Sequence, residues 1–516
     1  PRTVIPGLND SHLHAIRAGL FYNLELRWDG VGSLSEALDM VREQAKRTPK
    51  GQWVRVVGGW SEFQFLERRM PTLDEVNQAA PDTPTFILHL YDRAFLNRAA
   101  LAALGINRDT PNPPGGEIER DSQGDPTGLL LAKPNALILY SAISKAPKLS
   151  YEDQLDSTKL FLRELNRFGL TSAIDAGGGG QAYPNDYRVA CDLARKGELT
   201  LRIAYYLFAQ QPKRELSDFS RWVDENEPFQ NDDFFRPNGF LLSGAGENLL
   251  WSAADFENFL EPRPVLEPSM AIELKKVVEL LVRHRWPFRI HGTYDESITR
   301  FLDVFEEVDR EVPFNGLRWI IDHAETISER NLQRIRALGG GIAVQDRLAF
   351  QGEHFLARYG AEAASQAPPI KRMLSMGLPV GAGTDATRVA SYNPWVSLYW
   401  LISGKTAGGV PLYPPANRLD RLEALRLYTV GSAWFSGEEE QKGKLEPGFF
   451  ADFAVLSDDY LTVPEDRIPH LESVLTAVGG KVVYGAQEFE RFSPPPLPVS
   501  PDWSPVAKFG GYHRKT

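Results

Sequence analysis

Short apolar segments alternate with amphipathic helical segments along most of the chain. Eight apolar segments have the length of buried strands, at residues 4–12, 169–177, 201–208, 238–246, 288–292, 317–325, 340–345 and 379–385. Apolar residues with a helical period lie between several of them, and predict helices at residues 158–169, 271–284, 329–339 and 369–377. Eight strand–helix units without a reversal predict an α/β fold of the (β/α)8 TIM-barrel type. A doubly wound open sheet is the alternative.

One long segment interrupts this alternation after the first strand. Residues 25–150 hold a helical stretch (33–47), two strands (53–60 and 83–91) and a segment rich in proline and glycine (110–128). We expect a large α/β insertion over the C-terminal mouth of the barrel, where the active-site loops of such barrels gather.

The pattern changes again toward the C-terminus. Strand-like segments at residues 451–457 and 474–485 predict a small β-sandwich subdomain over residues 436–490. Residues 491–516 are rich in proline and predict an extended tail. The barrel, with its insertion, would then occupy residues 1–435.

Composition narrows the class of protein and its partners. Hydrophobic residues make up 42% and charged residues 24% of the 516 positions, with a net charge of −11. The negative charge argues against a nucleic-acid or anionic-membrane partner, because both are bound mainly through Lys and Arg. The single cysteine, Cys191, excludes an internal disulfide framework, and no signal peptide or membrane-length apolar run is visible. A cytoplasmic protein is expected, and a homo-oligomer is compatible with the sequence, as is a segment preceding Pro1.

Four histidines and one aspartate stand at the ends of predicted strands. His12 and His14 end the first strand one residue apart, so their side chains point the same way. His291, His323 and Asp385 end the fifth, sixth and eighth strands. In a barrel these strand ends converge on one cavity. Imidazole and carboxylate groups suit Zn²⁺ and related divalent ions, so the set predicts a metal site.

The histidines also have structural interpretations when each is taken alone. His323 could be a core histidine paired with Asp322 or Glu325, and His291 could be a buried hydrogen-bond donor. The whole set favours a metal. His89, in the second inserted strand, either faces the cavity or packs inside the insertion. The remaining histidines are expected to be solvated: His284, His354, His470 and His513.

Several motifs together resemble the amidohydrolase superfamily of metal-dependent hydrolases. They are "PGLNDSHLH", "GLTSAID", "GTDA" and "GKLEPGFFADFAVL", with isolated His291 and His323 between them. The segments "AFLNRAALAALGI" and "PPGGEIERDSQGDPTGLL" are similar to the branch that contains N-substituted formamide deformylases. The resemblance covers residues 1 to about 485. It implies a barrel with a composite β-sandwich built from both chain ends, whose N-terminal strands would precede Pro1.

The sequence departs from that family at two further places. Many relatives bridge two metal ions with a carboxylated lysine at the end of strand four. This chain has Leu241 or Leu242 there, and Glu247 is the nearest carboxylate. One ion, Zn²⁺ or another divalent metal, is therefore expected rather than two, with a bridging Glu247 as the alternative. In "LYDRAF", Asp92 and Arg93 replace the Gly-His that the branch often has near its substrate.

With a metal present, the expected reaction is hydrolysis of a C–N bond, most simply an amide, in a small organic substrate. A divalent ion makes hydroxide available near neutral pH. Asp385 would act as general base and acid, and His323 or the metal would polarise the carbonyl. A metal-dependent deaminase of a heterocycle and a catalytically degenerate binding homologue are the alternatives.

The side chains that would contact the substrate come mainly from the insertion. The expected residues are Trp60, Phe63, His89, Arg93 and Trp395. Aromatic residues at a mouth can clamp an apolar group, or they, together with Phe65, can form the core of the insertion. A substrate carboxylate could pair with an arginine, the candidates being Arg93, Arg347 and Arg388.

Overall fold

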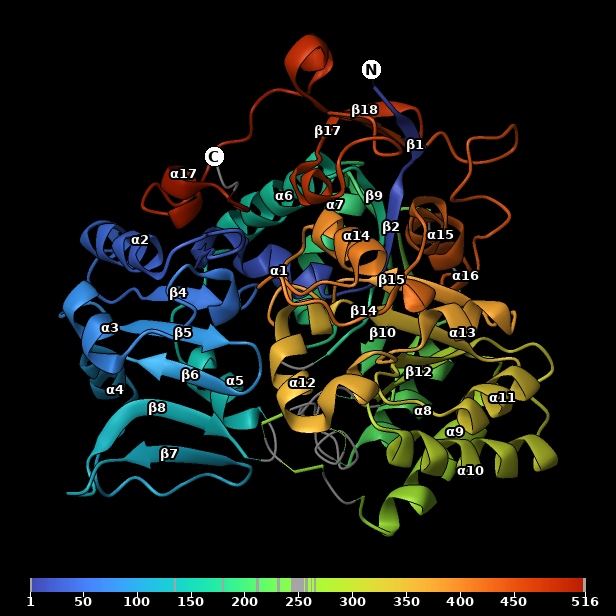
Figure 1. Cartoon of the computed structure of the whole chain (residues 1–516), viewed down its shortest axis with the longest axis horizontal. Helices are drawn as coiled ribbons and strands as arrows, with labels where there is room; N and C mark the ends of the chain where they lie inside the picture. The colour runs from blue at the N-terminus through green and yellow to red at the C-terminus, as the bar shows by residue number, and fades with distance from the viewer. Residues whose placement is uncertain are drawn as a thin grey trace.

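Eight parallel strands form the central barrel of the protein (Figure 1). The structure is a computed structural model that describes residues 2–133, 136–178, 181–209, 213–229, 233–242, 255, 259–260, 262–263 and 266–513. In spatial order the strands are β2 (Leu8–Leu13), β9 (Leu170–Asp175), β10 (Arg202–Phe208), β11 (Phe235–Leu241), β12 (Phe288–Gly292), β13 (Trp319–His323), β14 (Gly341–Gln345) and β15 (Val380–Gly383). The edge strands meet, because the Asp385 N–H donates to the His12 carbonyl at 2.8 Å and the His14 N–H donates to the Ala386 carbonyl at 3.1 Å. The barrel is confirmed over the open sheet.

Helices follow the barrel strands and cover the outside of the barrel (Figure 1). They are α1 (Ala15–Phe21), α6 (Tyr151–Arg167), α7 (Arg188–Arg195), α8 (Glu215–Glu225), α9 (Ser269–Arg283), α10 (Asp295–Glu311), α11 (Glu329–Leu338), α12 (Arg347–Ala364), α13 (Ile370–Ser375) and α14 (Pro394–Ser403). Local sequence sets their ends. In α11, the Ser328 hydroxyl accepts the Asn331 N–H, and Gly339 takes the left-handed φ of +73° that ends the helix.

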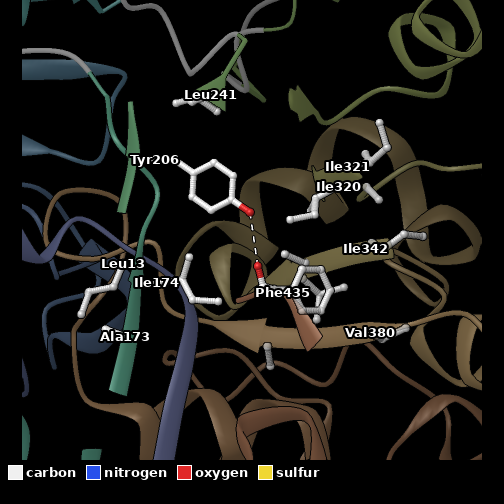
Figure 2. Close-up of a cluster of buried hydrophobic side chains, with 14 of the residues drawn as sticks. Leu13, Ala173, Ile174, Tyr206, Leu241, Ile320, Ile321, Ile342, Val380 and Phe435 are labelled. Atoms are coloured by element: carbon white, nitrogen blue, oxygen red, sulfur yellow. Dashed lines mark hydrogen bonds between the residues drawn. The ribbon is translucent and has the colours of Figure 1, made fainter. Parts of the chain in front are cut away.

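Buried apolar side chains of the strands pack on both faces of the barrel wall below the strand ends (Figure 2). The strand residues labelled there are Leu13, Ala173, Ile174, Tyr206, Leu241, Ile320, Ile321, Ile342 and Val380, each at most 3% exposed. Phe435, just after α16 (Ser432–Trp434), packs into the same cluster, and its carbonyl accepts the Tyr206 hydroxyl at 3.2 Å. Burial of this apolar surface stabilises the barrel, which holds the polar side chains at the strand ends in fixed positions.

The insertion folds around its own six-stranded sheet (Figure 1). Its strands, in spatial order, are β3 (Glu25–Leu26), β4 (Val54–Val57), β5 (Thr85–His89), β6 (Arg93–Leu96), β8 (Pro126–Ala132) and β7 (Gly116–Arg120). Its helices are α2 (Leu34–Arg47), α3 (Leu73–Ala79), α4 (Arg98–Leu104) and α5 (Leu137–Ser144). The segment rich in proline and glycine thus holds the β7–β8 hairpin. Gly58 packs on the loop after β15, since a Cβ there would lie 2.0 Å from the Arg388 carbonyl oxygen.

The first apolar run divides between two sheets at Gly7. A Cβ at Gly7 would lie 2.1 Å from the Thr171 hydroxyl, so only glycine lets the chain pass there. Where a β-sandwich is expected, the described residues form one antiparallel sheet that includes the N-terminal strand. Its strands are β1 (Val4–Pro6), β16 (Phe453–Leu456), β17 (Ser473–Val478) and β18 (Lys481–Gly485).

The tail runs back along the protein and ends beside the insertion (Figure 1). It contains the short helix α17 (Pro505–Phe509). Near its end the Tyr512 N–H donates to Glu164 of α6 at 3.0 Å, and the His513 N–H donates to the Asp29 carbonyl at 2.9 Å. None of the helices in the described ranges combines the length and apolar character that a bilayer-spanning segment needs.

Candidate metal centre

Three ligand-type side chains meet at the wide end of the barrel. One donor atom from each of His12, His323 and Asp385 lies within 4.8 Å of the other two. His14 joins them, because its Nε2 lies 2.9 Å from Asp385 Oδ1, and His12 Nε2 lies 3.2 Å from the same oxygen. The His291 ring lies 4.3 Å from the His323 ring, one step farther out. All five side chains are buried, and the strand ends bring four of them together, with His291 beside His323.

Hydrogen bonds on the far side of two imidazoles orient them toward this centre. His14 donates from Nδ1 to the Gly177 carbonyl at 2.6 Å, so the lone pair of its Nε2 faces Asp385. His12 Nδ1 lies 3.0 Å from Asp322, which also accepts from Arg289 Nε at 2.8 Å. Such outer partners fix the tautomer and direction of metal-binding histidines. Asp322 thus supports His12 and not its neighbour His323, contrary to the pairing considered from the sequence.

Two of the converging residues have unusual backbone conformations. The φ of His323 is +80° and that of Asp385 is +56°, in the left-handed region that non-glycine residues rarely adopt. Each such residue costs about 1–3 kcal/mol. Strain of this kind gathers at functional sites, where surrounding contacts hold it.

Burial and neighbouring charges set the ionisation of the centre. Burial, then the charge of Arg347, lowers the pKa of His323 well below its usual value. Burial also lowers the pKa of His14. Burial opposes protonation of His12, but the nearby aspartates outweigh it and raise the pKa. Burial opposes ionisation of Asp385, yet the histidines and Arg347 hold its pKa well below its usual value. Asp385 is therefore a carboxylate at neutral pH.

These residues fit a divalent cation. Neutral imidazole nitrogens and an ionised carboxylate are the donors that Zn²⁺ takes. The two oxygens of Asp385 have different neighbours: Oδ1 faces His12 and His14, and Oδ2 accepts from Arg347 Nη2 at 3.0 Å. Arg347 is 1% exposed. It was a candidate for binding a substrate carboxylate, but its interaction with Asp385 gives it a role inside the centre instead.

The fourth strand contributes apolar side chains at the expected position of the lysine. Leu241 ends β11 with 3% exposure, and Leu242 is fully buried. Glu247, the carboxylate considered as a bridge between two ions, lies outside the described residues.

A second polar cluster joins the insertion to α12. His89 donates from Nδ1 to Asp92 at 2.6 Å and from Nε2 to Glu62 at 2.9 Å. The other oxygen of Glu62 accepts from His354 Nε2 at 2.8 Å, and Arg93 donates to Asp92 at 2.5 Å. Both ring nitrogens of His89 are thus taken up by carboxylates. The assignments of His89 and Arg93 as substrate contacts are not supported, because each already has a protein partner.

This cluster gives a pH-dependent prediction. Burial opposes protonation of His89, but Asp92 and Glu62 outweigh it and raise the pKa to about 9, from 6.5. A raised histidine pKa stabilises the folded protein fully below pH 6.5 and loses this effect as the pH rises through about 9. His89→Gln should therefore lower stability by about 3 kcal/mol at pH 6, since it removes the shared cation from two buried carboxylates, Asp92 and Glu62.

The measurement is the thermal unfolding midpoint of both proteins between pH 6 and 10. The difference should shrink as the pH rises through about 9. The matched control is His284→Gln, at the exposed end of α9, which should change little at any pH. A His89→Gln deficit that stays constant to pH 10 would contradict the charged state of His89.

Several aromatic residues lie in the core instead of at the mouth. Trp60 is fully buried among Trp28 and Phe65, and its indole N–H donates to the Leu88 carbonyl at 2.9 Å. Trp395 is also fully buried, and its N–H donates to the Phe168 carbonyl at 3.0 Å. These features favour the alternative, a place in the core, and the assignment of Trp60 and Trp395 as substrate contacts stays a prediction. Phe63 is partly exposed, with its ring 5.1 Å from that of His354.

The remaining histidines divide between surface and interior. His284 is exposed, as expected, whereas His354, His470 and His513 are only partly exposed. The expectation of full solvation is therefore met by His284 and only in part by these three. His470 and His513 line a cavity of about 270 Å³ between the insertion, α14 and the tail, and His354 faces Glu62.

The functional candidates that sequence reasoning missed are the partners of the histidines. Asp322 sits beside His323 in "IIDHAE", so the motif contained a signal, but the sequence alone did not show which histidine it would face. Arg289, two residues before His291, and Glu62 carried no such signal. Their roles follow only from the fold, which pairs Arg289 with Asp322 and Glu62 with His89 and His354.

Comparisons with known proteins identify the family of the chain and support its fold. Residues 2–484 match the family described as "Amidohydrolase family". The N-substituted formamide deformylase of Arthrobacter pascens is 27% identical over 500 residues, which cover 94% of this chain and 88% of that protein.

Solved structures share the fold. An uncharacterized metal-dependent hydrolase from Pyrococcus horikoshii aligns with a TM-score of 0.63 and 22% identity, over 90% of this chain and 88% of that one. Atrazine chlorohydrolase from Arthrobacter aurescens, solved with zinc, aligns with a TM-score of 0.50 and 14% identity, over 95% of this chain and 86% of that one. At these identities the likeness extends to the fold alone.

Proposed function

Since this chain belongs to the amidohydrolase family, we propose that it is a metal-dependent hydrolase that cleaves the C–N bond of a small organic amide. The observation that carries the proposal is the meeting of His12, His14, His323 and Asp385 at the barrel mouth. The formamide deformylase activity in the name of one relative supports an N-acyl amine as the substrate class.

The proposed metal ligands are the five converging residues, His12, His14, His291, His323 and Asp385. We propose one ion, Zn²⁺ or another divalent metal, because the lysine that would bridge a second ion is absent from the fourth strand, where Leu241 and Leu242 stand. A zinc-bound structural neighbour and the donor chemistry support zinc. When bound, such an ion lowers the pKa of water to roughly 7 and polarises a carbonyl oxygen.

Asp385 is the proposed proton-transfer group. Its carboxylate is ionised at neutral pH, so it can take a proton from the attacking water. The same group, once protonated, can deliver the proton to the leaving nitrogen. Arg347 holds Oδ2 of Asp385 in place, which leaves Oδ1 on the side of the histidines. His323 stands beside Arg347 and is proposed to help polarise the carbonyl.

Hydrolysis assays on the metal-loaded protein test the proposal. N-formyl and N-acetyl amines should be hydrolysed, with activity lost on chelation and restored by Zn²⁺, Mn²⁺ or Co²⁺. Release of ammonia from aminated heterocycles instead would favour the deaminase alternative. A protein that neither holds metal after purification nor gains activity when these ions are added would contradict the hydrolase.

A further inference from the structure

Arg388 differs from the other buried arginines of the described chain. Four of those face carboxylates, in the pairs Arg27–Glu25, Arg202–Asp452, Arg289–Asp322 and Arg347–Asp385. Arg55 donates to the Pro147 carbonyl, and Arg17 donates to the Tyr91 hydroxyl. Arg388 is only 8% exposed, yet among the described residues its guanidinium meets no carboxylate and no hydrogen-bond acceptor. A buried guanidinium that donates no hydrogen bond to an anion is costly, so this position favours an anion from outside the chain.

The position of Arg388 is fixed relative to the metal centre. It follows Asp385 by three residues, in the loop between β15 and α14. Its backbone packs against Gly58 of the insertion, where a Cβ would lie 2.0 Å from the Arg388 carbonyl oxygen. Its guanidinium carbon lies 4.4 Å over the Tyr140 ring of α5. The side chain thus lies at the seam between the barrel and the insertion.

A second cation stands on the same side of the centre. Arg17 lies on α1, three residues after His14, and its Nη2 is 3.5 Å from the Tyr91 hydroxyl. The Tyr91 ring lies 5.7 Å from the Tyr140 ring. Burial and then the charge of Arg17 lower the pKa of Arg388, so the two guanidinium groups lie near each other. Two guanidinium groups and two aromatic rings therefore gather beside the His14 face of the centre.

We propose that Arg388, with Arg17 beside it, binds a carboxylate of the substrate, so that the enzyme acts on N-acyl compounds bearing a carboxylate away from the scissile bond. This inference rests on the proposed function and names its substrate class. A guanidinium offers two parallel N–H groups that match the two oxygens of a carboxylate. Low solvent access strengthens such a pair, and an anion here would give the Arg388 guanidinium a hydrogen-bonded partner in addition to the Tyr140 ring.

Binding to a catalytically inactive protein tests the subsite without relying on turnover. The probes are N-formylphenylalanine and its neutral amide, measured by titration calorimetry on the zinc-loaded Asp385→Asn variant. The acid should bind about 10- to 100-fold more tightly than the amide, as expected for a charge-assisted pair. Adding Arg388→Gln should remove this preference and leave binding of the amide within about threefold. Adding Arg388→Lys should keep part of the preference, because the charge stays but the planar fork is lost.

The matched control is Arg55→Gln, which removes another buried arginine, one that donates to the Pro147 backbone carbonyl, and should leave the preference intact. Equal binding of acid and amide before the Arg388 change, or equal loss of both after it, would overturn the subsite. The parent enzyme separates the two proposals. If the parent enzyme prefers the acid but hydrolyses neither compound, the proposed function is contradicted for N-acyl compounds that bear a carboxylate, and the subsite is still supported. Hydrolysis of both compounds, with equal affinity for the acid and the amide, would support the proposed function and overturn the subsite.

Discussion

Asp385→Asn should lower kcat by about 10³- to 10⁴-fold and leave the metal bound. The change keeps the shape of the side chain and one oxygen, but removes the charge that would accept the proton of the attacking water. The expectation follows from the low pKa of Asp385, which keeps the group ionised at neutral pH. It follows also from the 2.9 Å and 3.2 Å separations of Oδ1 from the His14 and His12 nitrogens. The measurement is kcat on an N-formyl amine, with metal content determined on the same sample.

The control for this variant is Asp82→Asn, an exposed carboxylate in the insertion, which should leave both quantities unchanged. Loss of metal from Asp385→Asn would show that its ligand role dominates and would leave its role in proton transfer without support. Activity within tenfold of the parent would remove Asp385 from proton transfer altogether.

The second large effect is expected for His14→Ala. His14 is oriented by the Gly177 carbonyl and directs its other nitrogen toward Asp385. Its loss should therefore weaken metal binding by at least 100-fold, since even the loss of a partner outside the ligand set costs 10- to 100-fold. Activity should fall with metal occupancy and return in part when Zn²⁺ is supplied in excess. The measurement is competition for the metal with a chelator of known affinity.

His284→Ala is the matched control for histidine removal, because His284 is exposed at the end of α9. Unaltered metal affinity in His14→Ala would count against His14 as a ligand. A thermal midpoint measured on the metal-free proteins distinguishes a lost ligand from a damaged fold.

The strands of the barrel could be predicted because their apolar residues form short runs bounded by turn residues. The convergence of the strand ends followed from the barrel itself. The division of the first run at Gly7 could not be predicted in this way. It depends on the close approach of Thr171, which lies far along the sequence. The C-terminal sheet likewise draws β1 from the opposite end of the chain.

The candidate residues of the metal centre could be predicted from the sequence, because the histidines are few and stand at strand ends. The residues that surround the centre could not be predicted in this way. In the sequence, Trp60 and Trp395 cannot be distinguished from aromatic residues that line a pocket. Only their burial and their hydrogen bonds to backbone carbonyls in the fold indicate a structural role. Glu62 and His354 lie 292 positions apart. Nothing local in either segment indicates that the insertion and α12 share a hydrogen bond.

The central claim is that His12, His14, His291, His323 and Asp385 hold one divalent cation. Anomalous scattering at the zinc edge, collected from crystals of the zinc-loaded protein, tests it most directly. We expect a single strong peak at the barrel mouth, with the imidazole nitrogens and an Asp385 oxygen at about 2.0–2.2 Å from the zinc ion. A zinc peak elsewhere in the molecule, or none at this cluster, would contradict it.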